Sequence, residues 1–158
     1  MQRALTFVKV DFPPEHPLPR FLPFAAAALL AVVGSLAADR LLVAIGTHVF
    51  PATKGYVHFR FSDYAKLTVV GVVGASLAWP IVTWISSAPR WLFFRLAIVV
   101  TLVLWLPDLW ILAHGQPVRA VIVLVLMHLA IALVTYNALV RIAPARRSPP
   151  GAARESAA

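Results

Sequence analysis

The long apolar run over residues 21–50 constrains this chain more than any other feature. Residues 21–38 carry no charge, and apolar sequence resumes after Asp39 and Arg40. A helix rises about 1.5 Å per residue, so roughly 20 apolar residues cross the hydrocarbon core of a bilayer. The run therefore predicts a transmembrane helix.

Three further apolar runs follow, and the four expected spans cover about residues 22–46, 65–86, 91–112 and 118–142. The whole chain is 61% hydrophobic and only 13% charged, whereas about a quarter of the residues of a soluble domain are charged. Short connections make consecutive helices antiparallel neighbours. We expect an all-α fold, an integral membrane four-helix antiparallel bundle.

The spans divide the chain into three parts. Residues 1–20 contain four prolines, which prevent a continuous helix, and form a Pro-rich lead-in. Residues 21–143 form the four-span transmembrane domain, and the basic, Pro- and Ala-rich residues 144–158 form a disordered tail. Between the first two spans, polar and apolar residues partly alternate over residues 56–61, which predicts an extended segment or half of a short hairpin.

Arginine and lysine predict the orientation of the spans. They concentrate at the two termini and in the turn between the second and third spans: Arg3, Lys9, Arg20, Arg90, Arg95, Arg141, Arg146, Arg147 and Arg154. The positive-inside rule then places both termini in the cytoplasm. Because these charges flank apolar runs, the basic balance of the chain does not indicate nucleic-acid binding.

Small residues follow one face of each of the first two spans. On the first span the face holds Ala27, Ala31, Ser35 and Ala38, and on the second Tyr64, Thr68, Gly71, Gly74, Ala75 and Ala78. Such faces let helices approach closely in lipid, where association depends on packing. Asp39 lies four residues after Ser35, so we expect its side chain to point into the bundle.

Six ionisable residues are expected near the outer boundary of the bilayer: Asp39, Arg40, Asp63, Asp108, His114 and Arg119. Ionisable groups within spans usually face a bundle interior or a water-filled cleft. Asp39 and Asp108 are candidates for acid–base catalysis or cation binding. Arg40, His114 and Arg119 are candidates for ligand binding, with an arginine neutralising an anionic group. Structural ion pairs, Asp39–Arg119 or Asp108–Arg40, are the alternative.

His128 lies about ten residues into the fourth span, which places it near the midplane. It is a third catalytic candidate, as a proton relay, a metal ligand or a quinone contact. A neutral imidazole bonded to Thr101, Ser35 or a carbonyl group is the alternative. The spans contain no paired histidine or acidic ligand motif, so we expect no metal site and no cofactor.

The chain resembles the small four-span membrane proteins of unknown function that are common in high-GC actinobacteria. The likeness rests on the Ala-rich first span, on residues 67–75 (LTVVGVVGA) and on residues 126–129 (LMHL). It covers about residues 22–142 and implies four antiparallel helices in a bacterial inner (plasma) membrane. It implies no established activity.

The sequence leaves three functions open. The leading prediction is a non-enzymatic scaffold or accessory subunit that packs against itself or a larger membrane complex, because the chain carries two small-residue faces. The second is a carrier or binder of a lipid-like or small apolar molecule. The third is a membrane enzyme acting on a lipid or isoprenoid, with Asp39 or Asp108 as acid.

Overall fold

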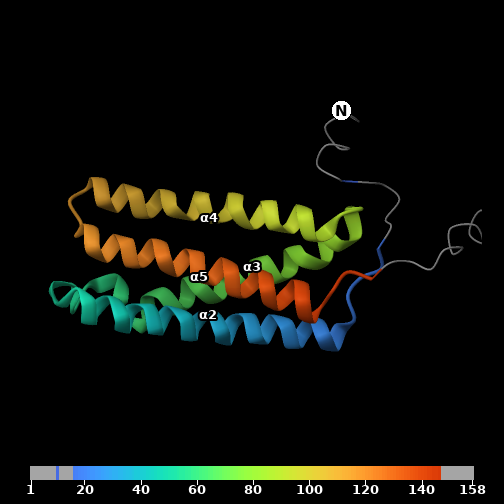
Figure 1. Cartoon of the computed structure of the whole chain (residues 1–158), viewed down its shortest axis with the longest axis horizontal. Coiled ribbons are helices and arrows are strands. Elements are labelled where there is room, and N and C mark those ends of the chain that lie inside the picture. The colour runs from blue at the N-terminus through green and yellow to red at the C-terminus, as the bar shows by residue number, and fades with distance from the viewer. Residues whose placement is uncertain (1–9, 11–15, 147–158) are drawn as a thin grey trace, which may run out of the picture.

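The computed structural model describes residues 10 and 16–146, and these form a bundle of four long helices (Figure 1). The helices are α2 (Phe21–Val49), α3 (Phe61–Ile85), α4 (Pro89–Ala113) and α5 (Val118–Ile142). Two single-turn 3₁₀ helices, η1 (Pro51–Thr53) and η2 (Val57–Phe59), connect α2 to α3. The expected all-α four-helix bundle is confirmed.

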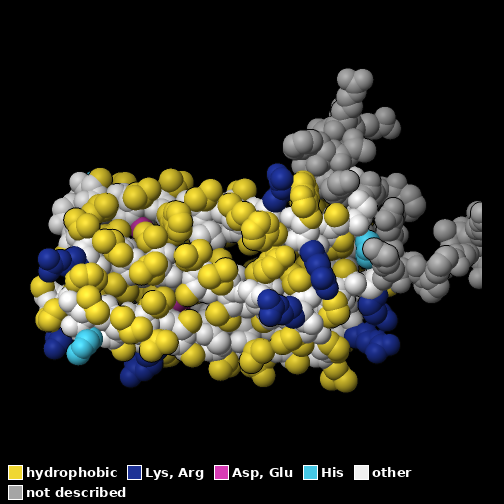
Figure 2. All heavy atoms as spheres, in the orientation of Figure 1, with side chains coloured by type: hydrophobic (Ala, Val, Ile, Leu, Met, Phe, Trp, Pro, Cys, Tyr) yellow, Lys and Arg dark blue, Asp and Glu magenta, His cyan; other side chains and the backbone are white. Residues whose placement is uncertain are grey.

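Each of the four helices is long and apolar enough to cross a membrane. Large apolar side chains cover the flank of the bundle, while lysine and arginine gather toward its two ends (Figure 2). This is the reverse of a soluble bundle, whose outer surface is polar. The chain is a multi-pass integral membrane protein.

The helices alternate in direction, so the start of α2 and the end of α5 lie at the same end of the bundle (Figure 1). We call this the terminal end, and the opposite end, which holds η1 and η2, the distal end. The expected lead-in over residues 1–20 and the tail over residues 144–158 fall largely outside the described residues.

The closest helix pair is α2 with α5. Ala31 of α2, Val72 of α3 and Ala138 of α5 pack in one buried cluster. Toward the distal end, a Cβ atom on Gly46 would lie only 2.6 Å from Val123 Cγ2. The small-residue face of the first span therefore serves the close approach of α5.

Helices α3 and α4 meet at the terminal end and diverge toward the distal end (Figure 1). Where they meet, Trp79 of α3 packs against Phe93 of α4, with ring centroids 5.0 Å apart. Trp79 Nε1 also donates to the carbonyl oxygen of Ala143, 2.8 Å away, just beyond the end of α5. One buried indole thus ties three parts of the chain together at the terminal end.

The small-residue face of the second span is only partly inside the bundle. Thr68 is buried, but Gly71 and Gly74 are exposed, and nothing lies within 4 Å of a Cβ atom added to either glycine. The buried face instead follows Thr68, Val72 and Ser76 at intervals of four residues. Both glycines therefore lie on a part of the small-residue face that this bundle leaves open.

The connection between α2 and α3 also differs from expectation. The stretch over residues 56–61 is not an extended segment, because it forms η2 and the start of α3. Local ring packing accompanies the turn, with the centroids of Tyr56 and Phe59 5.2 Å apart. Helix α2 continues to Val49, so the segment between the two helices is shorter than the sequence suggested.

Candidate functional site

Four polar side chains, one from each helix, lie in the distal half of the bundle. They are Asp39 of α2, Thr68 of α3, Asp108 of α4 and His128 of α5. We call them the polar cluster. Two direct contacts connect the cluster, Asp39 with Thr68 and Asp108 with His128. His128 also interacts electrostatically with both aspartates.

Asp39 is fully enclosed, with a relative exposure of 0%. The hydroxyl of Thr68 donates to its Oδ2 at 2.7 Å, while Oδ1 has no hydrogen-bond partner among the described residues. Arg40, the next residue, is exposed. The expectation that Asp39 points into the bundle on the face of Ala31 and Ser35 is confirmed.

Asp108 and His128 form a direct pair across α4 and α5. His128 Nδ1 lies 3.0 Å from Asp108 Oδ2, and it also lies 3.1 Å from the carbonyl oxygen of Leu124, one turn earlier. The side chain of Asp108 is 7% exposed and that of His128 is 25% exposed. The imidazole is therefore the more accessible partner.

The predicted arginine partners are wrong. Within residues 16–146, Asp108 pairs with His128 rather than Arg40, and Asp39 bonds to Thr68 rather than Arg119. Both arginines are exposed. The guanidinium of Arg119 lies over the ring of Phe50, 5.5 Å from its centroid. A long cationic side chain at the distal end can extend its charge to water or to lipid headgroups. This costs less free energy than taking the charge into the bundle to meet a buried carboxylate.

The structure brings together two residues that the sequence placed at different depths. Sequence counting placed Asp108 near the outer boundary and His128 near the midplane, yet the two side chains are in contact. Asp108 lies five residues from the end of α4, and His128 ten residues from the start of α5. Counting along each helix compares backbone heights only. Side chains tilt toward the N-terminus of their own helix, so on these antiparallel helices Asp108 leans away from the distal end and His128 leans toward it, which brings the two together.

Tyr56, in the connection between η1 and η2, adds a fifth polar group near the cluster. Its hydroxyl is buried and has no hydrogen-bond partner among the described residues. Burial, and then the negative charge of Asp108, raise the pKa of the Tyr56 phenol above its ordinary value of 10.0. Tyr56 packs against a buried group that includes Leu124 and Met127, the neighbours of His128 on α5, so it lies at the distal side of the cluster.

The other expected site residues stay apart from the polar cluster. His114 is exposed and its ring lies against Trp110, with centroids 4.0 Å apart. Asp63 lies in the first turn of α3, where a negative charge suits the helix dipole. The described residues contain no group of three histidine, aspartate or glutamate side chains that could hold a metal ion.

Buried hydroxyl groups extend the polar interior toward the terminal end. Those of Ser76, Thr83 and Thr101 donate to carbonyl oxygens four residues earlier in their own helices. The hydroxyls of Ser35 and Thr135 are buried but have no such partner in the described chain. The sequence could have pointed to these buried hydroxyl groups, because serine and threonine recur at helical intervals from Asp39 and His128.

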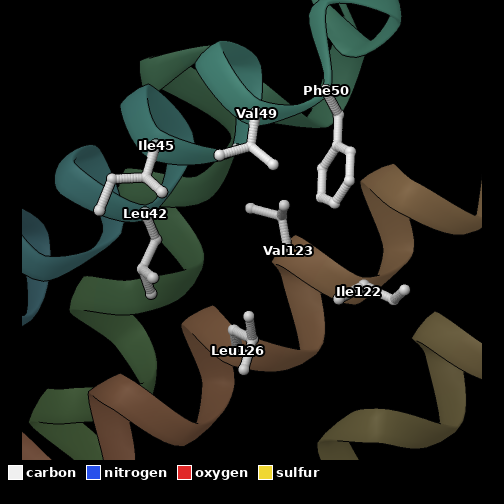
Figure 3. A pocket seen from close by; sticks show the side chains of 8 residues that line it. Leu42, Ile45, Val49, Phe50, Ile122, Val123 and Leu126 are labelled. Atoms are coloured by element: carbon white, nitrogen blue, oxygen red, sulfur yellow. The ribbon is translucent and has the colours of Figure 1, made fainter.

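Two surface hollows are lined almost entirely by apolar side chains. The first, between α2 and α5, has a volume of about 120 Å³ (Figure 3). It is lined by Leu42, Ile45, Gly46, Val49, Phe50, Ile122, Val123 and Leu126. The second, of about 310 Å³, lies at the terminal end and is lined by Leu18, Pro80, Ile81 and Trp84. Neither hollow includes a residue of the polar cluster.

Comparison with known proteins identifies no relative. No protein-family model matches the chain, and neither the curated proteins nor the solved structures include a significant match. The functional argument therefore rests on the chain's own residues.

Proposed function

We propose that this integral membrane protein is a non-enzymatic scaffold or accessory subunit of a membrane complex. The supporting observation is that the two carboxyl groups and the imidazole of the polar cluster face into the bundle. Asp39 is bonded to Thr68, and Asp108 is paired with His128, inside the bundle. What the flank offers to other molecules is mainly apolar helix surface (Figure 2).

The enclosed carboxylates give little support to a lipid-modifying enzyme. A general acid must come within hydrogen-bond reach of the group it protonates. Asp39 is 0% exposed and Asp108 5% exposed, and neither lines a described hollow. A substrate would have to separate the helices before it reached either acid.

Two surfaces favour a helical partner within the bilayer. Helix α4 buries few of its residues in this bundle, and a Cβ atom at Gly71 or Gly74 of α3 would meet open space. Because membrane helices associate where small residues permit close backbone contact, we place the partner's transmembrane helix against Gly71 and Gly74. A second copy of this chain or a different subunit supplies that helix.

The proposed location is a bacterial inner membrane with both termini in the cytoplasm. Helix α2 starts and helix α5 ends at the same end of the bundle (Figure 1), which supports a proposal that puts the sequence before α2 and after α5 in one compartment. The excess of arginine and lysine near that end supports the cytoplasm.

Bulky residues at the two glycines test the proposed contact. Both positions are exposed and an added Cβ atom meets nothing within 4 Å, so Gly71→Leu and Gly74→Leu are expected to fold while losing the partner. Ala37→Leu, a similar enlargement at an exposed position of α2, is the matched control. The protein is purified in mild detergent, and its mass and co-purifying chains are measured.

We expect the original chain and Ala37→Leu to form a homo-oligomer or a complex, and the glycine variants to be monomers. A monomeric original chain without partners would sink the proposal. An assembly that survives both glycine variants would contradict the proposed contact surface.

One observation favours the second candidate, a lipid binder. The α2–α5 hollow includes Phe50 (Figure 3). The guanidinium of Arg119 lies over that ring. An acyl chain in the hollow would place an anionic headgroup near Arg119. Native mass spectrometry should then show a bound anionic lipid that is lost in Arg119→Gln. Retention of the lipid in Arg119→Gln would contradict this candidate.

A further inference from the structure

The polar cluster carries an inference that is independent of any partner. It contains two carboxyl groups, Asp39 and Asp108, and one imidazole, His128, in the interior of a membrane bundle. If the imidazole is protonated and both acids are ionised, the cluster holds one uncompensated negative charge. An unpaired charge in such surroundings is costly, and natural proteins neutralise it.

The groups around the cluster offer no second positive charge. His128 is already in contact with Asp108. Thr68 of α3 and Tyr56 of the α2–α3 connection contribute neutral hydroxyl groups. Arg40, next to Asp39 in sequence, is exposed. The deficit of one charge therefore remains within the described part of the chain.

We infer that the polar cluster is a binding site for one exchangeable proton, which is held on Asp39. Asp39 is the acid without a charged partner in contact, and its Oδ1 is fully buried without a hydrogen-bond partner. Binding forms an O–H bond at Oδ1, and the proton comes from a hydronium ion, which leaves as water. The cluster then holds His128⁺, Asp108⁻ and a neutral Asp39.

The contact with Thr68 fits a protonated Asp39. Thr68 donates its only hydroxyl hydrogen to Oδ2, which is the carbonyl oxygen of the acid when Oδ1 carries the proton. Ser35, one turn earlier on the same buried face of α2, has a hydroxyl oxygen without a partner among residues 16–146. The Asp39 environment thus contains both a donor for Oδ2 and, close by along the helix, an unused acceptor.

A metal cation fits the same position less well. Metal cations bound by oxygen are surrounded by several oxygen ligands. The Thr68 hydroxyl points its hydrogen toward Asp39, and the described residues form no metal-holding group of histidines and acids. His128, whose side chain is 25% exposed and which interacts electrostatically with both acids, provides the route by which a proton exchanges.

Infrared difference spectroscopy of the full chain in lipid vesicles tests the inference, because a protonated carboxylic acid has its own C=O stretching band. We expect one buried acid band near neutral pH. Asp39→Asn, a neutral replacement of similar shape, should abolish this band. Asp63→Asn, outside the cluster, should leave it unchanged.

The variant His128→Gln distinguishes the proposed proton site from an acid that is only buried. Without the imidazolium, charge neutrality requires both acids to be protonated, so the band area should double. The absence of a band in the original chain, its persistence in Asp39→Asn, or an unchanged area in His128→Gln would each overturn the inference. Loss of the band when sodium chloride replaces choline chloride would assign the site to a cation instead.

Thr68 keeps the test decisive if Asp39→Asn does not fold. Removing the hydrogen bond to the carbonyl oxygen raises its stretching frequency, so Thr68→Val should shift the band upward. Thr68→Ser, which retains the hydroxyl, should not. Equal band positions in both Thr68 variants would contradict the assignment of the proton to Asp39.

Discussion

Replacing Gly46 with alanine is expected to force α2 and α5 apart. The added Cβ atom would lie 2.6 Å from Val123 Cγ2 and 3.2 Å from Val123 Cγ1. Since favourable carbon contacts are at about 3.5–4.0 Å, the helices or Val123 must shift by about 1 Å. Overpacking costs about 1–3 kcal/mol, and the better helix propensity of alanine returns about 1 kcal/mol. We expect a net destabilisation of up to about 2 kcal/mol.

A second substitution at the same contact, Val123→Ala, should restore stability, and Gly71→Ala is the control. Val123→Ala removes both Cγ atoms, while the remaining Cβ lies 3.5 Å from the new methyl group, an ordinary contact. The double variant should therefore be more stable than the sum of the single effects, by about 1–2 kcal/mol. Gly71→Ala meets nothing within 4 Å and should only gain helix propensity.

Unfolding in mixed micelles, followed by the fluorescence of the five tryptophans, measures these effects. The predicted order of stability is Gly71→Ala, then the original chain, then Gly46→Ala. If Gly46→Ala and Gly71→Ala shift the midpoint equally, the close packing of α2 on α5 is refuted. The same conclusion follows if Val123→Ala gives no rescue.

Three further substitutions test other contacts. Asp108→Asn weakens the bond to His128 and should cost about 2 kcal/mol, with little added loss in the double variant Asp108→Asn/His128→Gln; simple additivity in the same unfolding assay would contradict the pairing. Trp79→Phe removes the 2.8 Å bond to the carbonyl group of Ala143 and should cost about 1 kcal/mol, which thermal unfolding measures; an unchanged midpoint would exclude that bond. Burial and the charge of Asp108 raise the pKa of Tyr56, so its neutral form stabilises the fold below about pH 10, and this contribution is lost as pH rises through the higher pKa. Ultraviolet titration of the original chain against Tyr56→Phe should show that Tyr56 ionises above its ordinary pKa; ionisation at the ordinary pKa would show that the phenol is accessible to water.

The helices and the direction of Asp39 were predictable because each depends on one helix alone. A long apolar run without charge has few folded forms other than a spanning helix. Helical spacing puts Asp39 on the same face of α2 as Ser35 and Ala31. Because α5 packs against that face, the Asp39 side chain points into the bundle. Local periodicity carried this information.

The partners of the buried acids depend on how separate helices are placed, and the sequence does not record that placement. Asp108 meets His128 because their side chains lean toward each other from antiparallel helices, whereas counting residues compares only the heights of the backbone. The face of α3 was also ambiguous, since Gly71 lies three residues from Thr68 and Val72 four. The buried side follows Val72 and Ser76, so both glycines remain outside.

Measuring the contact between Asp108 and His128 tests the buried polar cluster most directly. Solid-state NMR in lipid bilayers, with ¹³C-labelled aspartate and ¹⁵N-labelled histidine and arginine, measures which nitrogen lies beside each carboxyl group. The structure predicts a strong carbon–nitrogen dipolar coupling that disappears in both Asp108→Asn and His128→Gln. A coupling of Asp108 to an arginine nitrogen, lost in Arg40→Gln and retained in His128→Gln, would contradict the account and restore the surface ion pair.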